Sequence, residues 1–277
     1  VTTAIMMLQE EGKLMISDRL AKYIPEFGET HVAVASEGGG YDLEAGRPIT
    51  LRHLITHTSG ISYGTGPASA EWDEAGFQQW YFADKNEAIG ETIARMASLP
   101  FDAQPGERWI YGYGIDILGA VVEKASGMEL DKYLQTRIFD PLSMGNTHFY
   151  LPHEKRDRFA AVYRRTEGGE LTRVPDSGAW RGQGAYVDGP RKSFSGGAGL
   201  LSTASDYARF LQMLLNGGEL DGARILGRKT VELMVTNHLG DREIDLLPVP
   251  NYGFGLGYAV EVFAIRFPEV PLLVIEP

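Results

Sequence analysis

Ser62 stands in the stretch GISYG (60–64), which matches the G-x-S-x-G pattern that presents the nucleophilic serine of many hydrolases. That pattern requires a strand before the serine and a helix after it. Here TLRHLITHTSG predicts a helix that is capped by Thr50 and terminated by Gly60, and a loop follows. We therefore expect Ser62 to lie in a turn at a helix end, with a nucleophile as the alternative interpretation.

Histidine side chains could bind a metal or transfer protons. The chain has six of them: His31, His53, His57, His148, His153 and His238. His53 and His57 are spaced i, i+4, so one helix face could present both to a metal. No glutamate follows His53 and no third ligand is evident, which favours a hydrogen-bonded structural role and predicts no metal site. Residue order leaves a Ser-His-Asp triad open, but it distinguishes no histidine from the others.

Two tyrosines lie in PGERWIYGYGIDILG (105–119), where a short extended piece enters an apolar helix. For Tyr113 the favoured interpretation is aromatic packing at the start of that helix. Tyr111 could act as a base or proton shuttle. A phenol has an ordinary pKa near 10, so a neighbouring positive charge must lower the pKa for this role. The hypothesis therefore predicts a lysine close to Tyr111 in the fold.

The composition is that of a soluble globular domain, with 43% hydrophobic residues and a net charge of −11. The negative charge argues against a nucleic-acid partner, and no basic stripe for an anionic membrane is present. No apolar run of 18 residues predicts a transmembrane segment. The absence of cysteine excludes disulfides and thiolate chemistry and leaves the compartment open, bacterial cytoplasm or periplasm.

The hydrophobic periodicity predicts a chain dominated by helices with few strands. Helices are expected at about 1–11, 50–58, 86–98, 114–126, 128–142, 203–216 and 228–238. A hairpin is predicted over 159–174 around Gly168-Gly169, a strand over 251–260, and a loop over 28–49. Because the sequence opens inside a formed helix, we expect that the chain is cut at its start.

Several segments in order resemble the serine β-lactamase and penicillin-binding-protein superfamily, closest to class C β-lactamases and family VIII carboxylesterases. They are VTTAIMMLQEEGKL, ITLRHLITHTSGISYG, PGERWIYGYGIDILGAVVEKASG, IFDPLSMGNTHFY and FSGGAGLLSTASDYARFLQMLLNGGELDGARIL. The resemblance implies an α+β, β-lactamase/transpeptidase-like fold: an antiparallel sheet flanked by helices, here incomplete, plus an inserted mostly helical domain. Residues 1–25 and 200–277 would form the partial sheet domain, and 26–199 the helical domain.

In that family the nucleophile belongs to a Ser-x-x-Lys motif just before a stretch similar to VTTAIMML. No serine here is followed by a lysine three residues later. The resemblance thus implies that the nucleophilic serine and its lysine lie upstream of this chain, and that Ser62 belongs to the family's structural HTSG turn.

Tyr111 matches the tyrosine of the second family motif, Y-x-N in β-lactamases and Y-S-x in many family VIII esterases, which implies a general base or proton shuttle. Tyr113 replaces the asparagine that orients a β-lactam amide, which implies a substrate-binding position and favours esters. Gly112 departs from both versions. The third motif is missing after GFGLG; His238-Leu239-Gly240 matches H-x-G by its letters, but we expect it on the preceding helix and do not assign it.

The resemblance implies a serine hydrolase, foremost a carboxylesterase acting on short-chain acyl esters through an acyl-enzyme, without a cofactor. A β-lactamase or D-Ala-D-Ala carboxypeptidase is the enzymatic alternative, and a degenerate, non-catalytic binding protein is the alternative of another class. The partner is thus a small-molecule ester or β-lactam, and the oligomeric state is open. Without the Ser-x-x-Lys motif, the chain as given is expected to be inactive.

Overall fold

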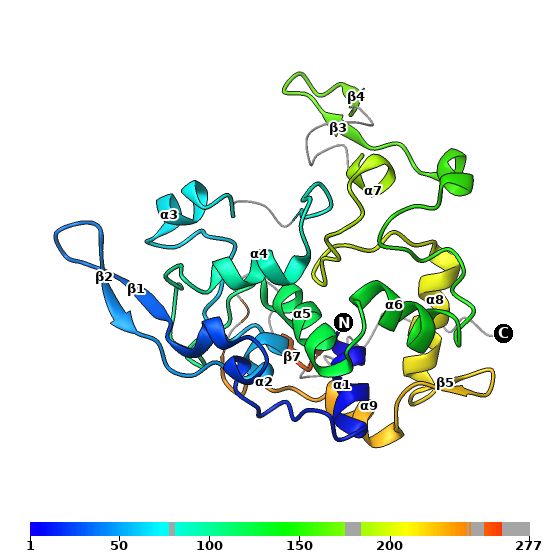
Figure 1. The fold of residues 1–277 in the computed structure, drawn as a ribbon, viewed down its shortest axis with the longest axis horizontal. Coiled ribbons are helices and arrows are strands. Elements are labelled where there is room, and N and C mark those ends of the chain that lie inside the picture. The colour runs from blue at the N-terminus through cyan, green and yellow to red at the C-terminus, as the bar shows by residue number, and fades with distance from the viewer. Residues whose placement is uncertain (78–80, 175–183, 243, 245–251, 262–277) are drawn as a thin grey trace, which may run out of the picture.

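The computed structural model describes residues 1–277 except 78–80, 175–183, 243, 245–251 and 262–277. In this described part, helices dominate and the strands form two-stranded antiparallel sheets (Figure 1). The α-helices are α1 (Thr2–Glu10), α2 (Leu51–Ile55), α3 (Ser69–Glu74), α4 (Ile89–Met96), α5 (Gly114–Ser126), α6 (Leu130–Leu134), α7 (Ala185–Asp188), α8 (Ala204–Leu215) and α9 (Arg228–Met234). The strands are β1 (His31–Ala35), β2 (Tyr41–Ala45), β3 (Tyr163–Arg165), β4 (Leu171–Arg173), β5 (Glu219–Leu220), β6 (Ala223–Arg224), β7 (Tyr252–Phe254) and β8 (Ala259–Glu261). Short 3₁₀ helices span Leu20–Lys22, Pro25–Gly28 and His153–Arg158.

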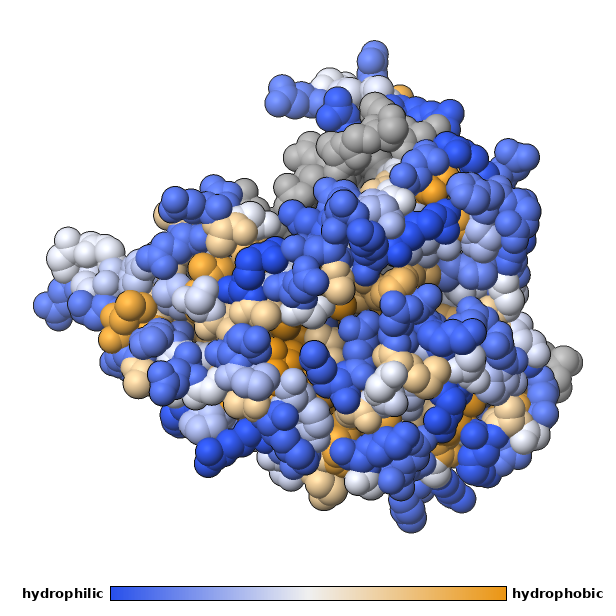
Figure 2. Space-filling model, in the orientation of Figure 1, coloured by the Kyte–Doolittle hydropathy of each residue, from blue (hydrophilic) through white to orange (hydrophobic). Residues whose placement is uncertain are grey.

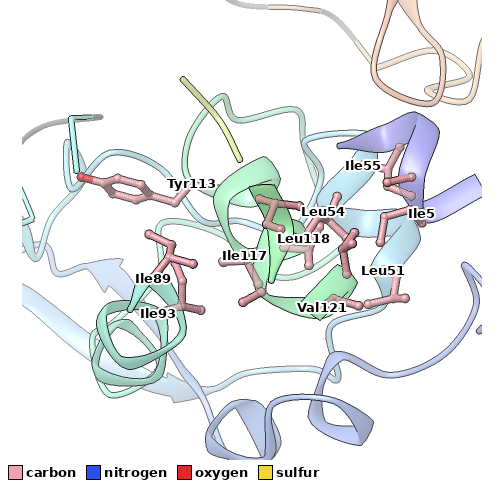
Figure 3. Close-up of a cluster of buried hydrophobic side chains, with 14 of the residues drawn as sticks. Ile5, Leu51, Leu54, Ile55, Ile89, Ile93, Tyr113, Ile117, Leu118 and Val121 are labelled. Atoms are coloured by element: carbon pink, nitrogen blue, oxygen red, sulfur yellow. The ribbon is translucent and has the colours of Figure 1, made fainter. Parts of the chain in front are cut away.

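Helix α5 lies at the centre of the molecule, and α1, α2, α4 and α6 pack against it (Figure 1). Its sequence GIDILGAVVEKAS is apolar on most sides, and residues 116–122 are all buried. A helix that is apolar nearly all round is a core helix. The side chains that surround it in Figure 3 are Ile5, Leu51, Leu54 and Ile55 on one side and Ile89 and Ile93 on the other. Tyr111 lies three residues before Gly114, the first residue of this central helix, so a rigid element supports it.

Helix α1 is also part of the core. All its side chains from Thr2 to Leu8 are buried, so burial extends beyond the single apolar face that the sequence predicts. Gly12, the predicted stop, has a φ of 70°, a conformation that glycine adopts without steric cost.

Helix α2 begins as predicted and ends early. The Thr50 hydroxyl accepts a hydrogen bond from the His53 backbone N–H, and His53 Nδ1 accepts one from the Thr50 N–H, both at 3.2 Å. This reciprocal pair is a capping box, in which histidine takes the place of the usual Glu or Gln. The helix ends at Ile55, and His57 has a φ of 54°. His53 and His57 therefore do not share a helix face, and the geometric basis for a metal site on that face is lost.

The loop predicted over 28–49 is wrong, because this segment contains the β1–β2 hairpin. Its register runs from His31 opposite Ala45 to Ala35 opposite Tyr41. Within β1 and β2 only Val32 and Ala33 are buried, so the strands lack the apolar alternation by which a strand is recognised. The glycines form the hairpin turn.

Of three other predicted elements, two differ in the structure and one is confirmed. The helix expected over 128–142 divides into α6 and a π-helical stretch at Gln135–Phe139. The strand expected over 251–260 is the β7–β8 hairpin, which reverses direction around Gly257. The hairpin expected over 159–174 is confirmed as β3–β4, with Tyr163 opposite Arg173.

The sequence predicts Ser202 or Thr203 as the cap of helix α8, and the structure has Thr203, but the buried side of the helix differs from the prediction. The spacing predicts Tyr207, Phe210, Leu211 and Leu214 on the inner side. Tyr207 and Leu211 are 54% and 41% exposed, whereas Asp206 and Met213 are buried. Hydrophobic spacing defines an apolar stripe, but neighbouring elements decide how much of the stripe is covered.

The surface seen in Figure 2 is mainly hydrophilic, with hydrophobic side chains gathered in small patches. Within the described residues, no helix has both the length and the hydrophobicity needed to cross a membrane. The main cluster of buried side chains includes Ala4, Leu51, Ile117 and Leu256. The division into residues 1–25 with 200–277 and residues 26–199 stays a prediction.

Candidate active site

The segment that carries Tyr111 is fastened to the turn that follows α2. The Gly106 N–H donates a hydrogen bond to the Thr58 carbonyl, and the Ile110 N–H donates one to the His57 carbonyl, both at 2.7 Å. Tyr111 follows directly and is 43% exposed. The backbone thus fixes the position of this tyrosine while its side chain remains accessible.

Three aromatic rings surround the Tyr111 ring. The His57 ring is nearest, with a centroid distance of 4.6 Å and an interplanar angle of 35°. Trp109 stacks at 6.0 Å, and Tyr63 lies edge-on at 5.7 Å. Tyr63 and Tyr111 are also hydrogen-bonded, and burial is the main reason why the pKa of Tyr63 is raised far above its ordinary value. A phenol with a raised pKa stays protonated at neutral pH, so Tyr63 can donate to Tyr111.

Tyr111 forms one wall of an open pocket of about 350 Å³. The other described residues that line it are Thr65, Gly66, Asp102, Arg108, Trp109 and Ile110. One Arg108 Nη donates a hydrogen bond to the Asp102 carbonyl at 2.9 Å. Burial raises the pKa of the Asp102 carboxyl, and the nearby Arg108 charge opposes this shift. The pocket therefore offers hydrogen-bond donors and acceptors beside an exposed phenol.

The lysine predicted near Tyr111 is not found in the part of the chain that the structure describes. Among those residues no lysine or arginine lies over the Tyr111 ring, and no lysine lines the pocket. Arg108 is the cationic residue that lines the pocket there. A lysine close to the Tyr111 phenol stays a prediction.

Tyr113 has no exposed surface. Its ring stacks on Trp72 with an interplanar angle of 3° and lies edge-on to Tyr63 at 4.8 Å. Phe77 and Phe82 also contact its ring. This burial favours the packing interpretation of Tyr113, and direct contact with a substrate stays a prediction.

Ser62 is 2% exposed and lies in a turn. Its Oγ accepts hydrogen bonds from the N–H groups of Gly64 at 2.9 Å and Thr65 at 3.2 Å, and its hydroxyl is bonded to the Asp102 carboxylate. A serine that closes its own turn in this way has a conformational role. The turn predicted at Ser62 is present, but it lies beyond the end of α2 at Ile55 and not directly at the helix end.

Asp116 is a buried acid in the first turn of α5 that the sequence analysis did not single out. It is 1% exposed, and its carboxylate accepts hydrogen bonds from the Ser195 hydroxyl and, at 3.0 Å, from the Gly197 N–H. These bonds fasten the glycine-rich stretch 195–199 to the central helix. An acid within the apolar run GIDILGAVV (114–122) was the available signal. Burial raises the pKa of Asp116 to about 6, and the two hydrogen bonds oppose this shift.

His57 and Asp116 predict opposite effects of pH on stability. Burial lowers the pKa of His57 to about 4, so the unfolded chain binds a proton more readily and stability falls as pH drops from about 6.5 to 4. Asp116 has a raised pKa, so stability falls as pH rises from about 4 to 6. One pKa unit corresponds to roughly 1.4 kcal/mol, so each group lowers the free energy of unfolding by about 3 kcal/mol across its pH range.

Urea unfolding between pH 4 and 7 checks this prediction. Relative to the parent protein, His57→Asn is expected to gain stability as the pH falls, and Asp116→Asn to gain stability as the pH rises. The exposed His153 provides the control substitution His153→Asn. Parallel stability curves for all four proteins would contradict the burial argument.

His238 lies beside β7, because α9 ends at Met234. The prediction that His238-Leu239-Gly240 lies on the preceding helix is therefore wrong. The His238 N–H donates to the Phe254 carbonyl at 2.8 Å, and the ring Nδ1 lies 2.6 Å from Arg52 Nη2. The ring is thus engaged by Arg52, and we assign it no part in the chemistry.

The chain matches the Beta-lactamase family model over residues 1–264. It is 34% identical over 268 residues to protein Rv1367c of Mycobacterium tuberculosis, covering 93% of this chain and 63% of that protein. Identity to the lovastatin esterase of Penicillium rubens is 32% over 249 residues, covering 86% of this chain and 57% of the esterase. The structure is similar to that of unliganded simvastatin synthase LovD from Aspergillus terreus, with a TM-score of 0.73 and 29% identity over 94% of this chain and 65% of that one. The chain therefore spans less than two thirds of the length of each of these proteins.

Proposed function

The chain belongs to the beta-lactamase family, and from this premise we propose that it is part of a serine hydrolase that cleaves short-chain acyl esters through an acyl-enzyme. Its fold is the α+β fold of the β-lactamase and transpeptidase-like proteins, with an incomplete sheet. An ester is the favoured substrate because a similar protein is named lovastatin esterase. The motif YGY at 111–113, without the asparagine of the lactamase motif, points in the same direction.

The placement of Tyr111 is the observation that carries this proposal. Its phenol is exposed at a pocket wall, and its backbone is fixed at the entrance to the central helix. In the proposed reaction the lysine of the Ser-x-x-Lys motif and Tyr111 together take the proton of the attacking serine and return it to the departing alcohol. The serine oxygen bonds to the acyl carbon, the ester C–O bond breaks, and water then releases the acid.

The serine and the lysine of this reaction would come from outside residues 1–277, since no serine in the sequence has a lysine at i+3. Ser62 is unsuitable because its hydroxyl is buried and bonded within its turn. Tyr113 would support the site by packing beneath Tyr63. Residues 1–277 thus provide the phenol and part of the pocket.

We expect that residues 1–277 alone hydrolyse neither p-nitrophenyl butyrate nor nitrocefin, because the nucleophile is absent. A fluorophosphonate probe, followed by mass spectrometry of tryptic peptides, should label no serine stoichiometrically. The matched sample is the longer product of the same gene, if it includes Ser-x-x-Lys, which should be labelled once, at that serine. Stoichiometric labelling of any serine within residues 1–277 would disprove this assignment.

The longer product also separates the alternatives. Faster turnover of p-nitrophenyl butyrate than of nitrocefin supports the esterase, and the reverse order supports a β-lactamase. Release of D-alanine from a D-Ala-D-Ala peptide would indicate a carboxypeptidase. A gene without any Ser-x-x-Lys codons, read beyond both ends, would favour the non-catalytic binding protein.

A further inference from the structure

His57 is a buried histidine for which the proposed reaction has no use. It is 4% exposed, and its ring contacts three others: Tyr111 at 4.6 Å, Phe254 at 5.5 Å and Trp109 at 5.8 Å between centroids. Among the described residues, the hydrogen bonds of His57 are made by its backbone N–H and carbonyl groups. Its ring therefore acts there through packing.

The backbone holds His57 and Tyr111 in a fixed relation. The His57 carbonyl accepts the hydrogen bond from the Ile110 N–H, one residue before Tyr111, and the adjacent Thr58 carbonyl accepts the one from Gly106. Both ends of the segment 106–110 are thus bound to the turn that carries His57. Within this frame, the ring of His57 covers the Tyr111 ring at an angle of 35°, and Trp109 and Tyr63 also contact the Tyr111 ring.

The backbone conformation of His57 explains why a histidine suits this position. Its φ of 54° lies in the left-handed region, which histidine, asparagine and aspartate enter more readily than most residues. Histidine is the one of these three that also has a flat aromatic ring. Burial lowers its pKa to about 4, so at neutral pH the ring is uncharged and packs without an unpaired charge.

We propose that His57 is a positioning residue whose ring holds the Tyr111 ring so that its hydroxyl faces the pocket of Thr65, Asp102 and Arg108. This inference rests on the proposed function, in which Tyr111 carries the proton. A partly exposed tyrosine whose ring contacts three other rings has few rotamers available. A proton carrier must be held in reach of its partner to be effective.

Two substitutions distinguish the effect of the His57 ring from the effect of the left-handed backbone conformation at this residue. His57→Asn keeps a residue that accepts the left-handed turn and removes the ring, whereas His57→Phe keeps an aromatic ring and strains the turn. In residues 1–277 labelled with ¹³C-tyrosine, the Tyr111 ring signal is identified by its loss in Tyr111→Phe. We expect this signal to show the ring-current shift of stacked rings in the parent protein and to keep it in His57→Phe. His57→Asn should lose the part of this shift that the His57 ring contributes, while Trp109 and Tyr63 keep theirs.

A merely structural role predicts a different pattern, in which the shift follows the free energy of unfolding and His57→Phe loses at least as much as His57→Asn. That pattern, or an unchanged Tyr111 signal in His57→Asn, would overturn the proposal. If His57→Asn does not fold, the parent protein decides: direct NOEs between the His57 and Tyr111 ring protons support the proposal and their absence refutes it. None of these readouts needs catalysis, so failure here is distinct from failure of the proposed function, which rests on activity.

Discussion

Replacing Gly112 by serine is expected to destabilise the protein by about 3 kcal/mol, although many family VIII esterases carry serine at this motif position. A Cβ at residue 112 would lie 2.5 Å from the carbonyl carbon and 2.6 Å from the Cα of Ser62, and it would also overlap the Ile61 carbonyl oxygen. All three are backbone atoms, which cannot move aside as a flexible side chain can. The departure from the family motif thus matches a close approach between the Tyr111 segment and the Ser62 turn.

Guanidinium unfolding of Gly112→Ser measures this cost. The control is Gly145→Ser, because a Cβ at Gly145 meets nothing within 4 Å. We expect the control to change stability by less than about 1 kcal/mol. Equal stability of the two variants would mean that the Tyr111 segment and the Ser62 turn do not approach each other so closely.

Replacing Tyr111 by phenylalanine is expected to lower kcat/KM for p-nitrophenyl butyrate by about 10²- to 10⁴-fold in a protein that joins residues 1–277 to a Ser-x-x-Lys segment. The loss should fall on kcat with little change in KM, because the hydroxyl acts on the proton in the transition state. Stability should change little, since the side chain is 43% exposed and its ring contacts remain in phenylalanine.

The matched control for this prediction is Tyr163→Phe. Tyr163 lies on the β3–β4 hairpin, which projects from the rest of the molecule in Figure 1, and is 58% exposed. Its replacement should leave kcat/KM unchanged. Comparable activity of Tyr111→Phe and the parent protein would remove Tyr111 from the reaction, whereas equal losses in both variants would indicate a general effect of losing a hydroxyl.

The sequence alone determined the features that depend on neighbours along the chain. The Thr50 cap, a cap at Ser202 or Thr203, the apolar α5 and the hairpin around Gly168-Gly169 follow from local spacing, and the structure has them. The turn at Ser62 follows from the same kind of pattern, since a serine can bond to backbone N–H groups two and three residues ahead.

The family assignment also came from the sequence, because motif order is preserved along the chain and needs no coordinates. It identified Tyr111 as the residue to test. It did not establish the geometry around this tyrosine, since the predicted lysine is not among the described residues that line the pocket.

Only the tertiary structure decided which surfaces are covered and which segments meet. The exposure of Tyr207 on α8 and the burial of Tyr113 depend on remote segments that pack, or do not pack, against them. The contact of His57 with Tyr111 and the close approach at Gly112 join residues about 50 positions apart. Periodicity describes one element at a time, whereas these contacts depend on the three-dimensional packing of several elements, which local spacing does not encode.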